Sequence, residues 1–464
     1  LVSDPASFNL LLAHCTTVWL CAAPEDHMKR VAAQGDLRPM AASREAMEDL
    51  KGILAGRAAF YSKAEFKVDT SADALEPTFR TLRQVVDWLL AQPEYAEVWA
   101  LQFAELTRAG TREAGAKGGR IVYEWLRRAF AENQGYDKLV TGLVLSQGAH
   151  LFGKAPSSFY NISFDSNAAD HATNISQIFL GVRIECSKCH NHPWEKWTQD
   201  DFYGFAAFFA RVGVKEVYEN DENATVYNEE GTVTHPKTKK TVTPKYLDGG
   251  LEPDEQDKDI REALARWMTR ADNPFFARAF VNRVWKRYLG RGLVEEVDDF
   301  RVTNPPTNPA LLDALASDFV RNRFNIKRLV RTILLSRTYQ LSAEPNETNR
   351  ADTINYSRFG MRRLQAETLT DAIAQVTGVP DKFAGYPPGT RAMQVYAGSS
   401  YMLSTFGRLS RDIICERDTQ PVTQQVGKST IIADKRANSI IVVGPKDTTE
   451  KIFALLDKLD VPQA

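Results

Sequence analysis

Several features that common protein classes require are scarce in this sequence of 464 residues. It has only five cysteines, too few for the disulfide framework that stabilises small secreted domains. Its 58 lysines and arginines nearly balance its 59 aspartates and glutamates, which leaves a formal net charge of -1. Because dedicated nucleic-acid binders are usually basic, we expect no nucleic-acid partner.

Long apolar runs are also missing. The most apolar early stretch, residues 8–23, is interrupted by Asn9, His14 and two threonines. No run approaches the ~18 to 20 residues that a membrane helix needs, so we expect no transmembrane segment. Since the chain begins with Leu1 instead of Met, we expect further residues before it, and the lack of a signal peptide excludes nothing.

What is present is typical of a folded globular chain with about three domains. Hydrophobic residues make up 43% and charged residues 25%, which excludes wholesale disorder. Apolar residues recur at helical spacing through most of the chain. The stretches predicted to be helices on this basis are 5–13, 43–61, 82–91, 95–108, 119–133, 136–146, 259–270, 274–289, 309–322, 326–336, 362–377 and 447–459.

The N-terminal region adds two short β-branched and aromatic runs, residues 17–22 and 66–69, which are predicted to be strands. Pro24, followed by two acidic residues, is predicted to open a helix between them. The order strand, helix, helix, strand predicts part of a parallel α/β sheet.

The stretches VSDPASFNLLLAHCTTVWLCAAPEDHMKRVAAQGDLRPM, ILAGRAAFY and VDTS in this region resemble the C-terminal half of a shikimate-kinase-like domain. The resemblance implies that Arg38 would face phosphates and that Arg57 would lie near a nucleotide. However, the chain has no GxxxxGK[ST] motif, and without that loop no row of backbone N–H groups cradles a triphosphate. We therefore expect a structural remnant without kinase activity.

The other non-helical segments are a polar stretch and the C-terminal tail. Residues 214–258, with a turn at 228–231, are predicted to form a linker or a β-hairpin. Residues 429–433 and 439–443 are predicted to be strands of a small ββα unit that completes with the last helix. We predict a mainly α fold, with a helical central region, a partial α/β segment at the N-terminus and the ββα unit at the C-terminus. The predicted domains are 1–84, 85–213, 214–258, 259–425 and 426–464.

The motif Cys186-Ser187-Lys188-Cys189-His190 carries the sharpest chemical signal, because CxxCH is the attachment motif of c-type haem. Two thiols one helical turn apart can bond the two vinyl groups of one porphyrin, and the adjacent imidazole can then bind the iron. With so few cysteines and histidines, a chance CxxCH is expected in about one such sequence per thousand. The motif therefore predicts Cys186, Cys189 and His190 as haem-binding residues.

Two other interpretations of this cluster stay open. Cys186, Cys189, His190 and His192 form a donor set that zinc favours, although four ligands from one short stretch would need a contorted loop. Alternatively, the two thiols are buried and reduced and the two histidines are solvated. In this second interpretation the cluster holds no cofactor.

A haem would have one more axial position, for which His150, His171 and Met268 are candidates that the sequence does not separate. The aromatic residues that follow the motif suit either the faces of a haem or an ordinary helical core. They are Trp194, Trp197, Phe202, Tyr203, Phe205, Phe208 and Phe209. Asp200 and Asp201 lie where a helix is predicted to begin, so we expect them to cap it.

The stretch FLGVRIECSKCHNHPWEKWTQDDFYGFAAFFARV resembles the cytochrome-like domain of unknown function that is abundant in planctomycetes. Its usual partner domain is matched by NPFFARAFVNRVWKRYLGRGLVEEVDDFRVTNPPTNPALLDALASDF, KRLVRTILLSRTYQLS, RRLQAETLTDAI and CERD. Together these cover about residues 85–425. The resemblance implies a secreted or periplasmic helical protein, often associated with the cell surface, whose CxxCH binds haem. It implies no established reaction.

The partner-like half contributes polar and aromatic residues that could form either a cleft lined by arginine and aspartate or a structural network of ion pairs and turn caps. We favour the structural network. The residues are Asn282, Arg283, Trp285, Asp298, Asp299, Arg301 and Asn304.

The tail STIIADKRANSIIVVGPKDTTEKIFALLDKLDVP resembles a secretin N-subdomain, with turn positions at Asp434, Asn438 and Gly444. One partial module excludes a channel, and it leaves self-association or docking as what the tail could add. Kinase-like domains are cytosolic, whereas haem attachment and secretin modules belong outside the inner membrane. We therefore expect a composite chain whose helical middle carries the function.

Two functions are consistent with these observations. The first is a periplasmic or surface-associated c-type haem protein that transfers electrons to an unknown redox partner or surface component. The alternative is a non-catalytic binding or scaffold protein in which the Cys/His cluster holds zinc or is purely structural. No catalytic triad, carboxylate pair or dinucleotide fingerprint stands out, so the sequence assigns no reaction.

Overall fold

In a computed structural model of the chain, the fold divides into two compact units, Leu1–Arg411 and Asp412–Ala464. The structure describes residues 8–9, 12–13, 17–26, 28, 45–71, 75–107, 115–148, 159–160, 167–193, 195–217, 222–249, 258–408, 422–426, 429–434 and 439–443. The helix predicted at 447–459 and the residues Arg38, His150 and Trp194 lie outside these ranges, as does most of the helix predicted at 5–13.

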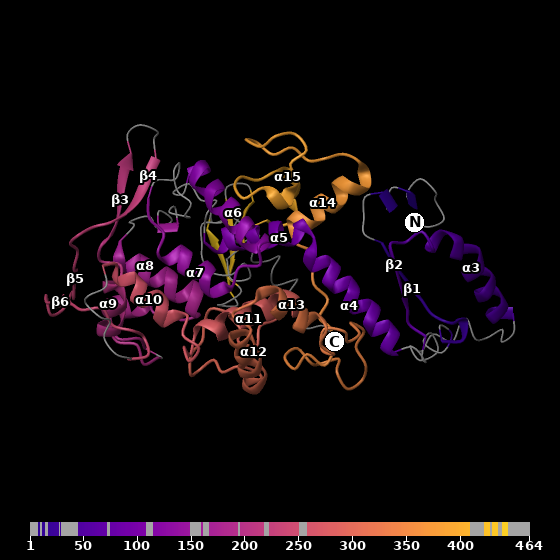
Figure 1. Cartoon of the computed structure of the whole chain (residues 1–464), viewed down its shortest axis with the longest axis horizontal. Helices are drawn as coiled ribbons and strands as arrows, with labels where there is room; N and C mark the ends of the chain where they lie inside the picture. Colours follow the sequence, from indigo (N-terminus) through magenta and orange to yellow (C-terminus); the bar gives the residue numbers. More distant parts are fainter. Residues whose placement is uncertain are drawn as a thin grey trace. The chain divides into compact units, whose positions relative to one another are not determined.

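The larger unit is mainly helical, as predicted (Figure 1). Most predicted helices appear with shifts of a few residues at their ends, because the buried apolar face of each one repeats with the helical period. These helices are α5 (Pro93–Leu106), α6 (Gly115–Ala131), α7 (Tyr136–Val144), α10 (Ile260–Met268), α11 (Phe276–Leu289), α12 (Pro309–Arg321) and α13 (Ile326–Leu334). Within the described ranges, no helix combines the length and apolar composition that a bilayer crossing requires.

An aromatic core joins helices from both halves of this unit. The ring of Tyr136 at the start of α7 stacks on Phe280 of α11 with ring centroids 3.9 Å apart. Phe280 also lies 6.1 Å from Phe103 of α5 and 5.3 Å from Phe319 of α12. All four side chains are buried. Because each buried aromatic ring removes a large apolar area from water, this cluster is a main source of stability for the unit.

Two helices begin at positions other than those predicted. Helix α4 (Leu75–Ala91) starts earlier than residue 82, because Pro77 falls in its first turn, where a missing N–H costs no hydrogen bond. Helix α14 (Ala366–Thr377) starts later than residue 362, since Gln365 has an extended, non-helical backbone with φ -62° and ψ 150°. The position after residue 84, where we placed a domain boundary, lies inside α4.

The N-terminal segment contains the predicted parallel strand pair. Strands β1 (Val18–Cys21) and β2 (Phe66–Asp69) pair in parallel register, and helix α3 (Glu45–Tyr61) lies between them in the chain. Trp19 of β1 stacks on Tyr61 at the end of α3 with centroids 5.9 Å apart. Phe66 contacts Trp88 of α4 at 5.3 Å, so the strand pair packs against the helical unit through α4.

The polar stretch forms two hairpins, where we predicted one hairpin or a linker. Strands β3 (Val212–Val217) and β4 (Glu222–Tyr227) pair antiparallel, and so do β5 (Val233–Thr234) and β6 (Thr241–Val242). The predicted turn at residues 228–231 connects the two hairpins and does not close either of them.

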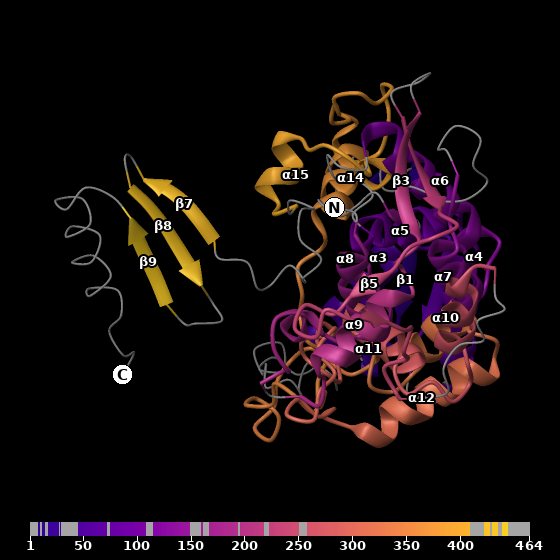
Figure 2. The ribbon, with the colours of Figure 1, turned by 90° about the vertical axis from the view of Figure 1, so that its left-hand side faces the viewer.

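The smaller unit holds a three-stranded antiparallel sheet in the order β7 (Val422–Val426), β8 (Ser429–Asp434) and β9 (Ser439–Val443), drawn in yellow in Figure 2. Strands β8 and β9 were predicted, but β7 was not. Its sequence VTQQV places two glutamines where an apolar run would have identified a strand. Asn438 and Gly444 lie outside the described residues.

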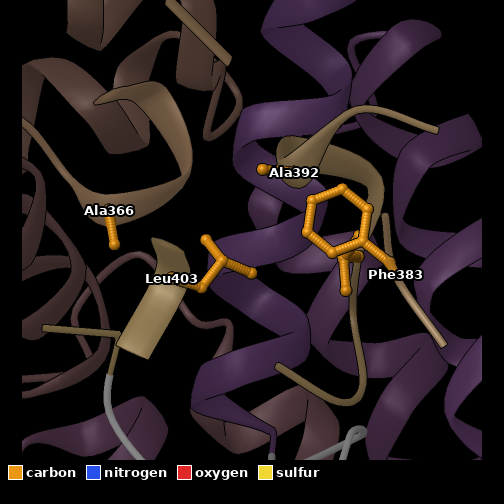
Figure 3. Close-up of a cluster of buried hydrophobic side chains, with 5 residues drawn as sticks. Ala366, Phe383, Ala392 and Leu403 are labelled. Carbon is orange, nitrogen blue, oxygen red and sulfur yellow. The ribbon is translucent and has the colours of Figure 1, made fainter. Parts of the chain in front are cut away.

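The last described part of the larger unit has a small core of its own, shown in Figure 3. It is formed by α14, the 3-10 turn η5 (Ala392–Gln394) and helix α15 (Tyr401–Thr405), which bury Phe383, Ala392 and Leu403. The carboxylate of Asp371 accepts hydrogen bonds from the backbone N–H groups of Ala392 at 2.6 Å and Met393 at 3.1 Å. These bonds attach η5 to α14.

Candidate functional site

The CxxCH motif lies in an irregular loop between two helical segments. Helix α8 (Ala168–Ile175) continues as the π-helical turn η3 (Ser176–Leu180), which ends at Gly181 with φ 68°. A side chain at Gly181 would meet the Phe300 ring at 2.7 Å, so glycine is required both by the left-handed backbone and by the close packing. The chain then enters the 3-10 turn η4 (Glu185–Lys188), which begins the loop.

The chemically active groups of this loop point to solvent. Cys186 and Cys189 are both exposed and neither forms a disulfide. The turn brings them together, since the N–H of Cys189 donates to the carbonyl of Cys186 at 3.4 Å. His190 is also exposed, and its Nδ1 lies 2.7 Å from the carbonyl oxygen of Asn191. Because a carbonyl can only accept, Nδ1 carries the proton, which leaves the Nε2 lone pair available to a ligand.

The backbone of the loop is fixed by hydrogen bonds to its flank and to the next helix. The buried Ser187 hydroxyl donates to the carbonyl of Trp197 at 3.2 Å. The carbonyl of Lys188 accepts from Gln199 Nε2 at 3.2 Å and from the Tyr203 hydroxyl at 3.0 Å. His192 donates its backbone N–H to the same Trp197 carbonyl at 2.8 Å. The loop is therefore held through Ser187 and its carbonyls while both thiols stay accessible.

Helix α9 (Gln199–Ala207), which supplies these supports, has a capping box at its start. The Thr198 hydroxyl accepts from the N–H of Asp201 at 3.2 Å, and the Asp201 carboxylate accepts from the N–H of Thr198 at 2.9 Å. Lys245 also donates to Asp201 at 2.7 Å. Burial opposes ionisation of Asp201, but the hydrogen bonds from Lys245 and Thr198 outweigh it and lower the pKa of the carboxyl. The predicted capping role is thus correct for Asp201.

Asp200 does not cap the helix and instead contacts His235. Its side chain is exposed and its Oδ1 lies 3.3 Å from Nε2 of the buried His235, on the segment between β5 and β6. Nδ1 of His235 accepts from the backbone N–H groups of Lys237 at 3.1 Å and Thr238 at 3.2 Å, so Nε2 carries the proton toward Asp200. The His235 ring packs near the Tyr203 ring, with centroids 5.5 Å apart. Tyr203 is the residue whose hydroxyl donates to the Lys188 carbonyl of the loop. Sequence reasoning did not identify His235, because nothing near it in the chain marks this contact.

The zinc set predicted from the sequence is not assembled in this structure. Cys186, Cys189, His190 and His192 all lie within the described ranges, where no three His, Cys, Asp or Glu side chains come together in a way that could hold a metal ion.

The aromatic residues after the motif are part of the helical core. Phe202, Phe205, Phe208 and Phe209 are each 0% exposed. Phe208 stacks on Tyr246 at 5.1 Å, and these rings pack among the helices and not over the loop. These four phenylalanines therefore belong to an ordinary helical core, whereas Tyr203 contacts the loop through its hydroxyl.

The described candidates for a second axial ligand are buried as well. His171 of α8 lies edge-on to Tyr160 at 4.9 Å and near Phe209 at 6.2 Å. Met268, the last residue of α10, is 0% exposed. Neither side chain reaches the surface on which the thiols lie.

The polar residues of the second half form a structural network next to the loop. Asp298 is 1% exposed and accepts hydrogen bonds from Gln177 Nε2 at 2.7 Å and from the guanidinium of Arg183, whose Nε lies at 3.1 Å. Asp299 pairs with Arg301 at 2.8 Å. Arg183 precedes Cys186 by three residues, so this network also anchors the start of the CxxCH loop.

Two asparagines complete the network as backbone caps. Asn282 is 0% exposed, donates to the carbonyl of Val294 at 2.8 Å and accepts from its N–H at 3.0 Å. Asn304 Nδ2 donates to the carbonyls of Glu295 and Asp299, each at 2.9 Å. Because their polar atoms are used internally, these side chains do not line a reactive cleft.

Comparison with known proteins finds two family models. Residues 29–213 match PSCyt2, a protein of unknown function (DUF1549), and residues 260–458 match PSD1, a protein of unknown function (DUF1553). These are the paired planctomycete domains whose resemblance the sequence indicated, and they extend beyond the predicted residues 85–425 in both directions. The shikimate-kinase and secretin resemblances receive no support. Searches of curated proteins and of solved structures give no match.

Proposed function

We propose that this chain is an extracytoplasmic c-type haem protein that carries one haem on the CxxCH loop and transfers electrons. Cys186 and Cys189 would form the thioether bonds and His190 would be the proximal ligand. The observation that supports this best is that both thiols are exposed and unbridged beside an imidazole whose Nε2 is available. A bound haem would supply a one-electron redox couple.

The residues of the loop suit this role in distinct ways. The thiols are accessible to the vinyl groups of an incoming porphyrin, because Ser187 and not a cysteine is the side chain that the turn buries. The bond from Nδ1 of His190 to the Asn191 carbonyl fixes the tautomer and the ring orientation, as second-shell partners of metal-binding histidines commonly do. Tyr203 and Gln199 keep the backbone between the two cysteines in place.

The proposed location follows from the proposed chemistry. Covalent haem attachment takes place outside the inner membrane, and the match to the PSCyt2 and PSD1 pair is compatible with such a location. The electron donor or acceptor would be a redox partner or a surface component.

The test is to produce the full chain in a bacterial periplasm together with the haem-attachment machinery and to record its pyridine haemochrome spectrum. We expect one covalently bound haem per chain. The double variant Cys186→Ala, Cys189→Ala should lose the haem. Cys21→Ala is a matched control, because the Cys21 thiol lies in β1, donates to the Val68 carbonyl at 3.6 Å and should not affect haem content.

A colourless protein under these conditions would contradict the proposal. Elemental analysis then separates the alternatives. Stoichiometric zinc that is lost in the double variant would show that the loop rearranges around a metal, whereas neither haem nor zinc would leave a scaffold with a structural Cys/His cluster.

A further inference from the structure

A surface groove of about 530 Å³ lies away from the CxxCH loop, where α4 and α13 pack together. Its walls come from Asp87 and Leu90 of α4, from Asn133 after the end of α6, and from Lys327 and Arg331 of α13. Figure 1 shows α4 and α13 as neighbouring helices of the larger unit. The groove could hold a molecule the size of a hexose derivative.

The charge around this groove is predominantly positive. Three cationic side chains line it, Lys327, Arg328 and Arg331, against the single carboxylate of Asp87. The chain around the groove is also rich in basic residues, since residues 319–343 include six lysines and arginines, although Asp318, directly before this stretch, lies 3.7 Å from both Arg321 and Arg328. The three basic residues of α13 fall on one face of the helix, because its other face is buried.

The one carboxylate is already committed to a partner. Asp87 receives two hydrogen bonds from Arg331, Nε to Oδ1 at 2.5 Å and Nη2 to Oδ2 at 3.0 Å. The hydrogen bond from Arg331 lowers the pKa of Asp87 and keeps its carboxylate ionised. This bidentate pair neutralises Arg331, so Lys327 and Arg328 carry the remaining positive charge of the groove.

Lys327 is the cation with the least compensation. Its ammonium lies over the Tyr95 ring, 4.8 Å from the centroid, and among the residues that the structure describes no carboxylate pairs with it. Burial lowers the pKa of this ammonium. Arg328 has only a loose contact, with its Nε 3.7 Å from Asp318 Oδ2. A partly desolvated ammonium without a counter-charge gains more from an incoming anion than a fully solvated one does.

The start of α13 adds a smaller favourable contribution. Asn325 caps the helix by accepting from the N–H of Arg328 at 2.9 Å, so the positive end of the helix dipole opens at the groove. This feature supports the charge argument and would not identify a site without it.

We propose that this groove binds a small ligand through an oxyanion group, a carboxylate, sulfate or phosphate, with Lys327 and Arg328 as the principal contacts. Arg331 and Asp87 hold the two helices that form its walls. The proposal does not depend on the haem, because none of these residues belongs to the CxxCH loop or its supports.

The test uses isothermal titration calorimetry of the full chain with three probes that share one scaffold: glucuronate, glucose 6-sulfate and glucose 6-phosphate. Glucose is the neutral control. We expect saturable binding of at least one anionic probe and none of glucose, and the ranking of the three identifies the preferred oxyanion. Lys327→Met, which keeps the packing on Tyr95 but removes the charge, should weaken binding about tenfold.

Two further variants make the result decisive. Arg328→Gln should weaken binding by a similar factor, while Lys215→Met removes an exposed lysine from strand β3 and should leave the affinity unchanged. The proposal is overturned if no anionic probe binds below about 10 mM, which is weaker than typical small-ligand sites. Equal binding of glucose, or an affinity unaffected by Lys327→Met and Arg328→Gln, would overturn it as well.

Discussion

Two polar segments lie against each other in the larger unit and use their side chains differently. In the CxxCH loop Cys186, Cys189 and His190 are exposed, and the loop is held mainly through its carbonyl groups. In the turn at residues 294–304, Asp298 is 1% exposed and its carboxylate is used by Gln177 and Arg183. The comparison shows how polar residues with a structural role differ from residues that remain available for a ligand.

The energetic expectation follows from burial. A buried charge that loses its partner costs several kcal/mol, whereas an exposed side chain without strong contacts can be replaced at little cost. The difference between the two segments should therefore be measurable as a difference in the free energy of unfolding.

The largest effect is expected for Asp298→Ala. Removal of this carboxylate takes away the buried acceptor that the guanidinium of Arg183 and the amide of Gln177 share, and we expect a loss of about 3 kcal/mol in the free energy of unfolding. Chemical denaturation measures it. The matched comparison is Cys186→Ala, Cys189→Ala in haem-free protein, which should change the same quantity by under about 0.5 kcal/mol. Equal costs for the two variants would show that the contrast between the segments is wrong.

A smaller effect is expected for Tyr203→Phe, which tests how strongly one hydrogen bond fixes the CxxCH loop. The variant removes the hydroxyl that donates to the Lys188 carbonyl at 3.0 Å, and we expect a loss of about 1 kcal/mol. Amide hydrogen exchange should accelerate at residues 187–190 and remain unchanged at Asn282. Tyr401→Phe is the control, because Tyr401 is 83% exposed. If exchange in the loop is unaffected, Tyr203 does not hold it.

The smallest effect concerns acid stability at the start of α9. The folded-state pKa of Asp201 is lowered, so its contribution is fully present above the unfolded pKa of about 3.9 and is lost as the pH falls through the folded pKa. Because Asp201 and Lys245 are both partly exposed, the contribution should be under about 1 kcal/mol. Lys245→Met should reduce the loss of stability between about pH 5 and pH 2, as denaturation curves at the two pH values would show. A loss identical to that of the unaltered chain would exclude this pair as a contributor.

Much of the fold could be predicted from the sequence because it depends on local periodicity. Buried residues such as Leu329, Val330 and Ile333 recur at the helical spacing that identified α13. Strands β1 and β2 and their parallel pairing were also predicted correctly, from two short runs in a strand, helix, helix, strand order. Strand β7 was missed because its glutamines give no apolar signal.

The site was predictable only in part. Cys186, Cys189 and His190 are identified by their spacing, which is a local property of the chain. Their supports are not local, because the partners of Arg183 and of Tyr203 are fixed only by the folded structure. Asp298 lies 115 residues from Arg183 in the sequence, and no pattern in either segment indicates the other.

The contact between Arg183 and Asp298 bears on whether the two regions of this chain can be separated during evolution. Each residue belongs to a different one of the two regions that match family models, and the stacked rings of Tyr136 and Phe280 cross the same division. A gene that lost either region would encode a chain in which one member of the Arg183–Asp298 ion pair is missing. The aromatic ring left from the Tyr136–Phe280 stack would then be exposed to solvent. The two regions would therefore be expected to persist or disappear together.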